Sequence, residues 1–236
     1  MNRKRTVLIT GFGPFPGAPF NPSGPLVQKL ARLRRPAFAD MRLIPHVFTT
    51  SYRSVDQELP KLISHHRPDA VLMFGLATRS RHVRIETQAR NALSASPDAM
   101  GQTAATSTIK HSHLPLPMRA PRAALLHAAR SCKIPARPSH DAGRYLCNYL
   151  YWRGLEAAGQ PRGAEIVVFI HIPNIRRKPV RRGVRRHRYS EYDLATTGEA
   201  ILRVIIAALK SPRLPFTHRC EKLANTLMSP RPTLQD

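Results

Sequence analysis

The chain has 236 residues, 42% of them hydrophobic, which is enough to build one sizeable core. We expect one domain over residues 1–210 and a proline-containing, poorly ordered tail over residues 211–236. No apolar run approaches the roughly 20 residues of a membrane span, which excludes a membrane protein of the helical class. The apolar run after MNRKR stops at Gly11, too early for a signal peptide, so we expect a cytoplasmic protein.

The charge is strongly basic, with 38 Lys and Arg against 14 Asp and Glu, or +24 at neutral pH. Such a balance predicts contact with polyanions, because basic side chains release counterions from phosphates. Residues 176–188 hold eight of these cations. Pro179 and Gly183 interrupt this segment, which predicts a loop and not a recognition helix. No stacking platform, RNP-like motif or zinc-finger spacing accompanies the charge, so nucleic-acid binding stays an alternative without a motif.

The cysteines and histidines predict neither a disulfide framework nor a metal centre. Cys132, Cys147 and Cys220 are an odd number of thiols in a chain without an export signal, so we expect them to be reduced. The histidine pairs at 65–66 and 111–113 lack nearby carboxylate or cysteine ligands. We expect no metal and no cofactor.

Hydrophobic periodicity predicts alternating strands and helices in the first half of the chain. In chain order they are a buried strand with a Gly/Pro turn over 5–17, a helix over 22–35, a strand over 41–50, a helix over 54–66, a buried strand over 68–77 and a half-exposed strand over 81–89. Ser23 is the expected cap of the first helix. Pro45 places its strand at a sheet edge, because proline has no N–H to donate.

The second half continues this alternation after a Ser/Thr/Pro-rich loop over 94–116. Its expected elements are helices over 121–134 and 144–158, a very apolar strand over 164–173, and a last helix ending at Lys210. Ser190 and Asp193 form a capping-box-like start to that last helix. Alternating strands and helices predict an α/β fold, a single three-layer α/β/α domain with a mostly parallel, twisted central sheet.

The loop GFGPFPG follows the first strand, where a phosphate-binding loop would also lie. Pro14 and Pro16 argue against that role, because a phosphate cradle is made of backbone N–H groups. The loop instead carries Phe12 and Phe15 near the carboxyl end of a strand, where ligands of α/β sheets bind. Both rings can equally cap the core.

A catalytic group can be assembled from three residues far apart in the chain. Cys147 falls in the first turn of its predicted helix, where the helix dipole favours a thiolate. His171 stands at the end of a strand, and Glu86 is one of the few acids. Each residue also has a simpler explanation. Cys147 can be a lone structural thiol, His171 a buried histidine whose ring nitrogens are hydrogen-bonded, and Glu86 the partner in an ordinary ion pair.

Five sequence blocks occur in a specific order: TGFGPFPG, NPS at 21–23, GLA followed by IET at 85–87, DAGRYLCN and FIHIP. Together they resemble the pyroglutamyl peptidase I family of cytosolic pyrrolidone-carboxylate peptidases over about residues 5–210. The resemblance implies a Cys147, His171 and Glu86 triad without a metal. It also implies a pyroglutamyl pocket that contains Phe12 and Phe15, together with Tyr145 and Leu146.

The function implied is that of a thiol exopeptidase that hydrolyses N-terminal pyroglutamate from peptides through a thioester. Two alternatives stay open: a thiol hydrolase of another small amide or acyl substrate, and a basic polyanion-binding protein on an inherited scaffold. Family members often continue with a Gly-rich run after GLA, whereas this chain has Thr78, Arg79 and Ser80. The family commonly assembles as homotetramers, an assembly that the charge of +24 opposes.

Overall fold

The computed structural model describes residues 3–110, 114–175 and 189–211. The basic segment 176–188 and the predicted tail beyond Ser211 lie outside the described residues. The central sheet has six strands in the order β2-β1-β3-β8-β4-β7. They are β1 (Arg5–Phe12), β2 (Met41–Phe48), β3 (Ala70–Leu76), β4 (Val83–Glu86), β7 (Ala136–Ser139) and β8 (Ile166–Ile172).

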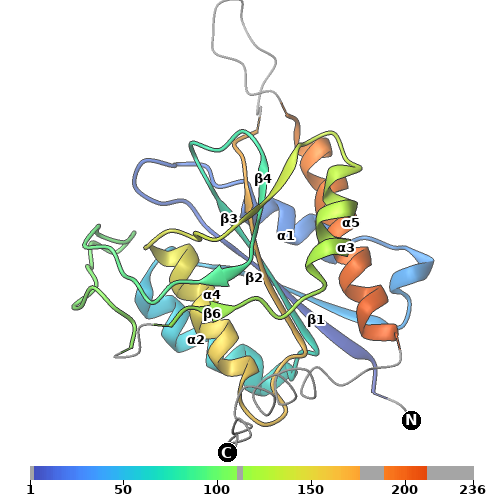
Figure 1. Ribbon diagram of the computed structural model, residues 1–236, viewed down its shortest axis with the longest axis horizontal. Helices are drawn as coiled ribbons and strands as arrows, with labels where there is room; N and C mark the ends of the chain where they lie inside the picture. The colour runs from blue at the N-terminus through green and yellow to red at the C-terminus, as the bar shows by residue number, and fades with distance from the viewer. Residues whose placement is uncertain (1–2, 111–113, 176–188, 212–236) are drawn as a thin grey trace, which may run out of the picture.

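Helices cover both faces of this sheet, which confirms the three-layer α/β/α prediction (Figure 1). One layer holds α1 (Ser23–Ala31), α3 (Arg122–Arg130) and α5 (Glu191–Lys210), and the other holds α2 (Tyr52–His66) and α4 (Leu146–Ala158). The strands β1, β3 and β8 are buried almost throughout, because each face of the sheet meets a helical layer. A short 3-10 helix η1 (Pro36–Phe38) and a small ladder of β5 (Gln88–Ala89) and β6 (Leu116–Pro117) complete the described elements.

One pairing of the sheet is antiparallel, and it positions the candidate site. β8 runs parallel to β3 but antiparallel to β4. Arg84 therefore lies opposite His171, and Glu86 lies opposite Phe169. The carboxyl end of β4 points back along β8 and carries the Glu86 side chain into the buried layer beneath the rim of the sheet.

The structure confirms several local predictions. β2 is an edge strand that contains Pro45, as the missing N–H requires. Ser190 and Asp193 form a complete capping box at the start of α5. One face of α5 is buried; its residues include Leu194, Gly198, Ile201, Leu202, Ile205 and Leu209.

The structure departs from the sequence predictions at three points. Ser23 does not cap α1: Pro22 occupies the cap position, and Ser23 is the first helical residue. The strand over 81–89 alternates as expected through Ile85, with Val83 and Ile85 buried and Arg84 partly exposed, but Glu86 is fully buried instead of exposed. β7 was not predicted at all, since its four residues include a proline and an arginine and show no alternation.

In the part of the chain that the structure describes, no helix combines the length and the apolar character that a membrane crossing requires.

Candidate active site

Cys147 is the second residue of α4, which confirms its place in the first turn of a helix. Gly143 precedes the helix at φ 87°, a left-handed conformation that lets the chain turn into it without a Cβ clash. Tyr145 at the cap position provides no side-chain hydrogen bond to the helix, and the first turn contains no acid. The first N–H groups of a helix have no partner within it, so they and the positive end of the dipole face the thiol region.

The thiol lies directly over Gly75 of β3. A Cβ atom built at this glycine would approach the Cys147 Sγ atom to 2.6 Å and the Phe169 ring to 2.7 Å. Both distances are too short for real contacts, so only glycine leaves room for the sulfur at this point of the sheet. Gly75 is also the register partner of His171, so the same backbone position brings the thiol and the imidazole together.

His171 lies one residue before the end of β8 and is only 6% exposed. Its Nδ1 atom is 2.7 Å from Glu86 Oε1, which leaves the Nε2 atom to face the thiol. Burial acts to lower the pKa of His171, but the charge of Cys147, its hydrogen bond to the ring and the Glu86 carboxylate outweigh burial and raise the pKa to about 9. The imidazole is therefore held protonated at neutral pH.

Glu86 ends β4 and is completely buried. Arg84 approaches the same Oε1 atom with its Nε at 3.1 Å, and it also donates from Nη2 to Ser139 Oγ at 2.8 Å. The Tyr151 hydroxyl donates to the Glu86 backbone oxygen at 3.1 Å. A buried carboxylate is costly unless it is paired, and here it faces both an imidazolium and a guanidinium.

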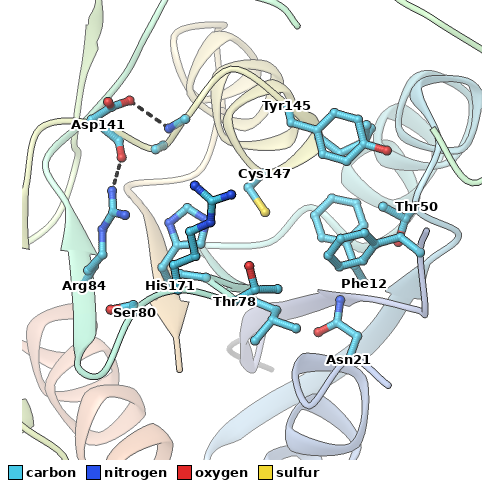
Figure 2. A pocket seen from close by; sticks show the side chains of 17 residues that line it. Phe12, Asn21, Thr50, Thr78, Ser80, Arg84, Asp141, Tyr145, Cys147 and His171 are labelled. Atoms are coloured by element: carbon cyan, nitrogen blue, oxygen red, sulfur yellow. Dashed lines mark hydrogen bonds between the residues drawn. The ribbon is translucent and has the colours of Figure 1, made fainter. Parts of the chain in front are cut away.

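A cavity of about 350 Å³ opens beside the thiol (Figure 2). All four residues predicted for a substrate pocket line it: Phe12, Phe15, Tyr145 and Leu146. Cys147 and His171 line it as well, whereas Glu86 is not among its lining residues and supports His171 from beneath. In Figure 2 the Phe12, Thr50 and Tyr145 side chains stand on one side of the sulfur.

Three polar residues that were not predicted to belong to the site hold the Phe12 loop in place. The Ser23 hydroxyl accepts a hydrogen bond from the Phe12 N–H at 3.0 Å and donates to Asn21 Oδ1 at 2.8 Å. Asn21 Nδ2 and the Thr50 hydroxyl both donate to the Gly13 carbonyl, at 3.1 and 3.0 Å. The NPS block at 21–23 was the only mark of Asn21 and Ser23 in the sequence. In the structure, its side chains anchor the loop that carries Phe12.

The structural role of Asn148 was also not predicted from the sequence. It is fully buried next to the thiol, and its amide accepts from the Arg90 N–H at 2.8 Å. Its Nδ2 donates to the carbonyls of Arg90 and Ala92 at 2.7 and 3.1 Å. This amide ties the start of α4 to the segment that follows Glu86. Its position directly after the cysteine was the only sequence signal.

Among the described residues, no group of three or more histidine, cysteine or acidic side chains can hold a metal ion. Covalent chemistry by the thiol, assisted by the imidazole, is what these side chains themselves offer.

Comparison with known proteins assigns the family. The sequence profile of pyroglutamyl peptidase matches residues 5–187, which is most of the chain although shorter than the expected 5–210. The chain belongs to the pyroglutamyl peptidase family. It is 34% identical over 178 residues to the pyrrolidone-carboxylate peptidase of Thermococcus onnurineus. The aligned region covers 72% of this chain and 84% of that protein. The pyrrolidone-carboxylate peptidase 1 of Ralstonia nicotianae is 34% identical over 176 residues, covering 71% and 78%.

Solved structures agree with this assignment. The pyrrolidone carboxyl peptidase of Thermococcus litoralis superposes with a TM-score of 0.78 at 25% identity and covers 90% of this chain and 100% of its own. Pyroglutamyl peptidase I of Bacillus amyloliquefaciens has the same fold, with a TM-score of 0.73 at 24% identity over 86% and 97% of the two chains. The chain is thus a pyroglutamyl-peptidase I-like hydrolase of the pyroglutamyl peptidase family.

Proposed function

We propose that this member of the pyroglutamyl peptidase family removes an N-terminal pyroglutamyl residue from peptides, with Cys147 as nucleophile. The observation that carries the proposal is the chain of contacts from the partly exposed thiol through His171 to the buried Glu86, at the wall of a cavity with two phenylalanines. A nucleophile, a base and an orienting acid in this sequence are the parts of a catalytic triad.

The acyl group fits the aromatic end of the cavity. A pyroglutamyl ring is small, flat and uncharged, so apolar walls with a few polar groups suit it. Phe12 and Phe15 provide ring surfaces, and Tyr145 and Leu146 contribute the wall formed by the start of α4. Asn21 and Thr50 line the same cavity and provide polar groups beside the Phe12 ring.

In the first half of the reaction, the Cys147 thiolate attacks the carbonyl carbon of the pyroglutamyl residue. The resulting oxyanion lies near the free N–H groups at the start of α4, and each such donor is worth about 2.7–4 kcal/mol in comparable sites. Collapse of this intermediate breaks the C–N bond as His171 gives its proton to the leaving amine. A thioester and the shortened peptide result.

In the second half, the now neutral His171 takes a proton from water, whose oxygen attacks the thioester carbon. Collapse of the second tetrahedral intermediate releases pyroglutamate and restores the Cys147 thiolate with protonated His171. Glu86 accepts the other imidazole N–H throughout, which fixes the tautomer and the ring orientation.

The test is hydrolysis of a pyroglutamyl-linked chromogenic amide, measured beside prolyl and alanyl amides. We expect cleavage of the pyroglutamyl substrate alone, and loss of at least about 10³-fold in kcat for Cys147→Ser and for His171→Ala. Cys132→Ser is the matched control, since this thiol hydrogen-bonds backbone carbonyls of α3 and α5 and does not line the cavity. Full activity in both active-site variants would contradict the mechanism.

A second candidate keeps the thiol chemistry and changes the acyl group. Thr78, Arg79 and Ser80, which replace the family's Gly-rich continuation, line the cavity itself. Their side chains alter its wall, so another small amide is the alternative substrate. Preference for the alanyl or another acyl amide over the pyroglutamyl amide, with the same dependence on Cys147, would favour it.

A further inference from the structure

The cavity has two chemically different ends, one on each side of the Cys147 and His171 pair (Figure 2). Phe12, Thr50 and Tyr145 stand on one side, and Arg84 and Asp141 stand on the other. When an acyl group occupies the aromatic end, the leaving portion of the peptide extends toward the charged end. This step rests on the proposed function.

The charged side chains that line the cavity are paired except for one. Arg84 pairs with Glu86 at 3.1 Å, and Asp141 pairs with Arg90 at 3.0 Å. Arg79 lines the same cavity and is exposed, and within the described ranges no side chain or carbonyl forms an ion pair or hydrogen bond with its guanidinium. One positive charge at the cavity therefore faces solvent without a counterion from the protein.

The backbone that carries Arg79 is held at both sides. Asn174 Nδ2 donates to the Thr78 carbonyl at 3.3 Å. The Ser80 N–H donates to the Ala77 carbonyl at 2.9 Å, and the Ser80 hydroxyl donates to the His82 carbonyl at 2.8 Å. The guanidinium thus projects from a fixed turn and presents planar donors that suit a carboxylate in a bidentate contact.

We propose that Arg79 is a specificity residue that binds a carboxylate on the leaving portion of the substrate, so that acidic pyroglutamyl peptides are preferred. The carboxylate has two sources: the side chain of an Asp or Glu that directly follows pyroglutamate, or the terminal carboxylate of a dipeptide. A pyroglutamyl peptide has no α-ammonium group, because its nitrogen is closed into the lactam. Its carboxylate therefore meets no cation of the peptide's own N-terminus and is free to pair with Arg79.

The experiment compares kcat/KM for pyroglutamyl-glutamate amide with that for pyroglutamyl-glutamine amide, which differs only in charge. We expect wild type to favour the glutamate substrate by about two- to fivefold, the range of a partly exposed ion pair, and to lose this preference as salt rises. Arg79→Ala is expected to bring the ratio to about one. Arg81→Ala removes an equal charge two residues away, outside the cavity, and should keep the ratio.

A further arm uses pyroglutamyl-glutamine with a free terminal carboxylate, which separates the two carboxylate sources. Preference for this substrate over its amide, lost in Arg79→Ala, assigns the contact to the chain terminus, and preference for the glutamate amide assigns it to the side chain. Cleavage of every substrate without a carboxylate preference, or a preference that survives Arg79→Ala, overturns this inference alone. Absence of any pyroglutamyl cleavage overturns the proposed function and the inference with it.

Discussion

The N-termini of α4 and α5 both carry the positive end of a helix dipole, but they differ in how their own side chains cap that end. α5 begins with Ser190 as cap, whose hydroxyl accepts from the Asp193 N–H at 3.2 Å, while the Asp193 carboxylate accepts from the Ser190 N–H at 2.8 Å. α4 begins with Tyr145, no side-chain cap and no acid in its first turn. The positive end of α5 is neutralised by its own residues, whereas no side chain in the first turn of α4 neutralises its positive end.

The two ends also differ in the charges around them. Asp193 is desolvated, which acts to raise its pKa, but hydrogen bonds from Ser190 and the nearby Lys133 outweigh this and lower the pKa. At α4, the charged groups come from distant strands, with protonated His171 on β8 beside Glu86 on β4. A local motif neutralises the end of one helix, whereas tertiary contacts place charged side chains beside the end of the other.

Glu86→Gln removes the acid that supports the charge at the α4 end, and we expect the largest effect from it. The change should lower kcat on the order of 10²–10⁴-fold, because a neutral amide no longer stabilises the imidazolium or fixes its tautomer. In wild type, kcat/KM should fall as pH rises through about 9, where His171 loses its proton. The variant's alkaline fall should come at lower pH, since Glu86 is one of the groups that raise this pKa against burial.

A matched control for this carboxylate exists elsewhere in the fold. Glu58 Oε2 lies 2.7 Å from His46 Nε2, the same type of pair at the same distance but more exposed. Glu58→Gln should leave both kcat and the pH profile unchanged. An identical pH profile in Glu86→Gln and wild type would show that Glu86 does not act through the His171 charge.

Gly75→Ala displaces the sulfur from the α4 end without altering any charge. The added methyl would clash with Cys147 Sγ and the Phe169 ring, so we expect about a 10²-fold loss of kcat from misplacement and a loss of about 1–3 kcal/mol in unfolding free energy. Gly198→Ala is the control, because its nearest neighbours are leucine methyl groups at 3.1 and 3.2 Å in the opposite layer. Activity that survives Gly75→Ala would mean that the thiol does not need this position.

Much of this arrangement was predictable because its signals are local in sequence. The α5 capping box spans four residues, and the start of α4 was marked by a glycine and helical spacing. The strand ends that carry Phe12 and His171 also followed from apolar runs. Each of these features depends on residues within one or two helical turns of each other.

The rest depends on contacts between distant segments. The antiparallel β4 sets Glu86 beneath His171, but strand direction is decided by pairing with β8 and leaves no mark in the four residues of β4. Ser23 is of a residue type that often caps helices, yet its hydroxyl accepts a hydrogen bond from the Phe12 N–H instead. Only tertiary packing decides between these two partners. The closeness of Gly75 to the thiol likewise appears only when β3 and α4 are brought together.

Tyr145→Asp and Tyr145→Asn would give α4 the type of cap that α5 has. Both residues accept a hydrogen bond from the helix, but only Asp adds a negative charge, so their difference isolates the electrostatic effect. Both lose the Tyr145 hydroxyl contact to the Pro97 carbonyl equally. We expect kcat/KM to be about three- to tenfold lower for Asp than for Asn, with slower iodoacetamide alkylation of Cys147, because the carboxylate opposes the thiolate. Equal values would argue against a role for the open helix end.

Ser190→Ala removes the side-chain cap of α5 and should have the smallest effect on catalysis. Loss of the cap leaves the Asp193 N–H without its side-chain acceptor, which should cost about 1 kcal/mol in unfolding free energy measured with denaturant. Ser64→Ala near the end of α2 is the control. Among the described residues, this exposed hydroxyl hydrogen-bonds only to the Lys61 carbonyl of its own turn, so its loss should change the unfolding free energy by less than about 0.5 kcal/mol. Since α5 packs on the face of the sheet opposite to α4, kcat/KM should stay unchanged in both variants. A fractional loss of activity larger than the fraction of unfolded protein would mean that the two helix ends are coupled through the sheet. The distinction between a stabilising end and a reactive end would then not hold.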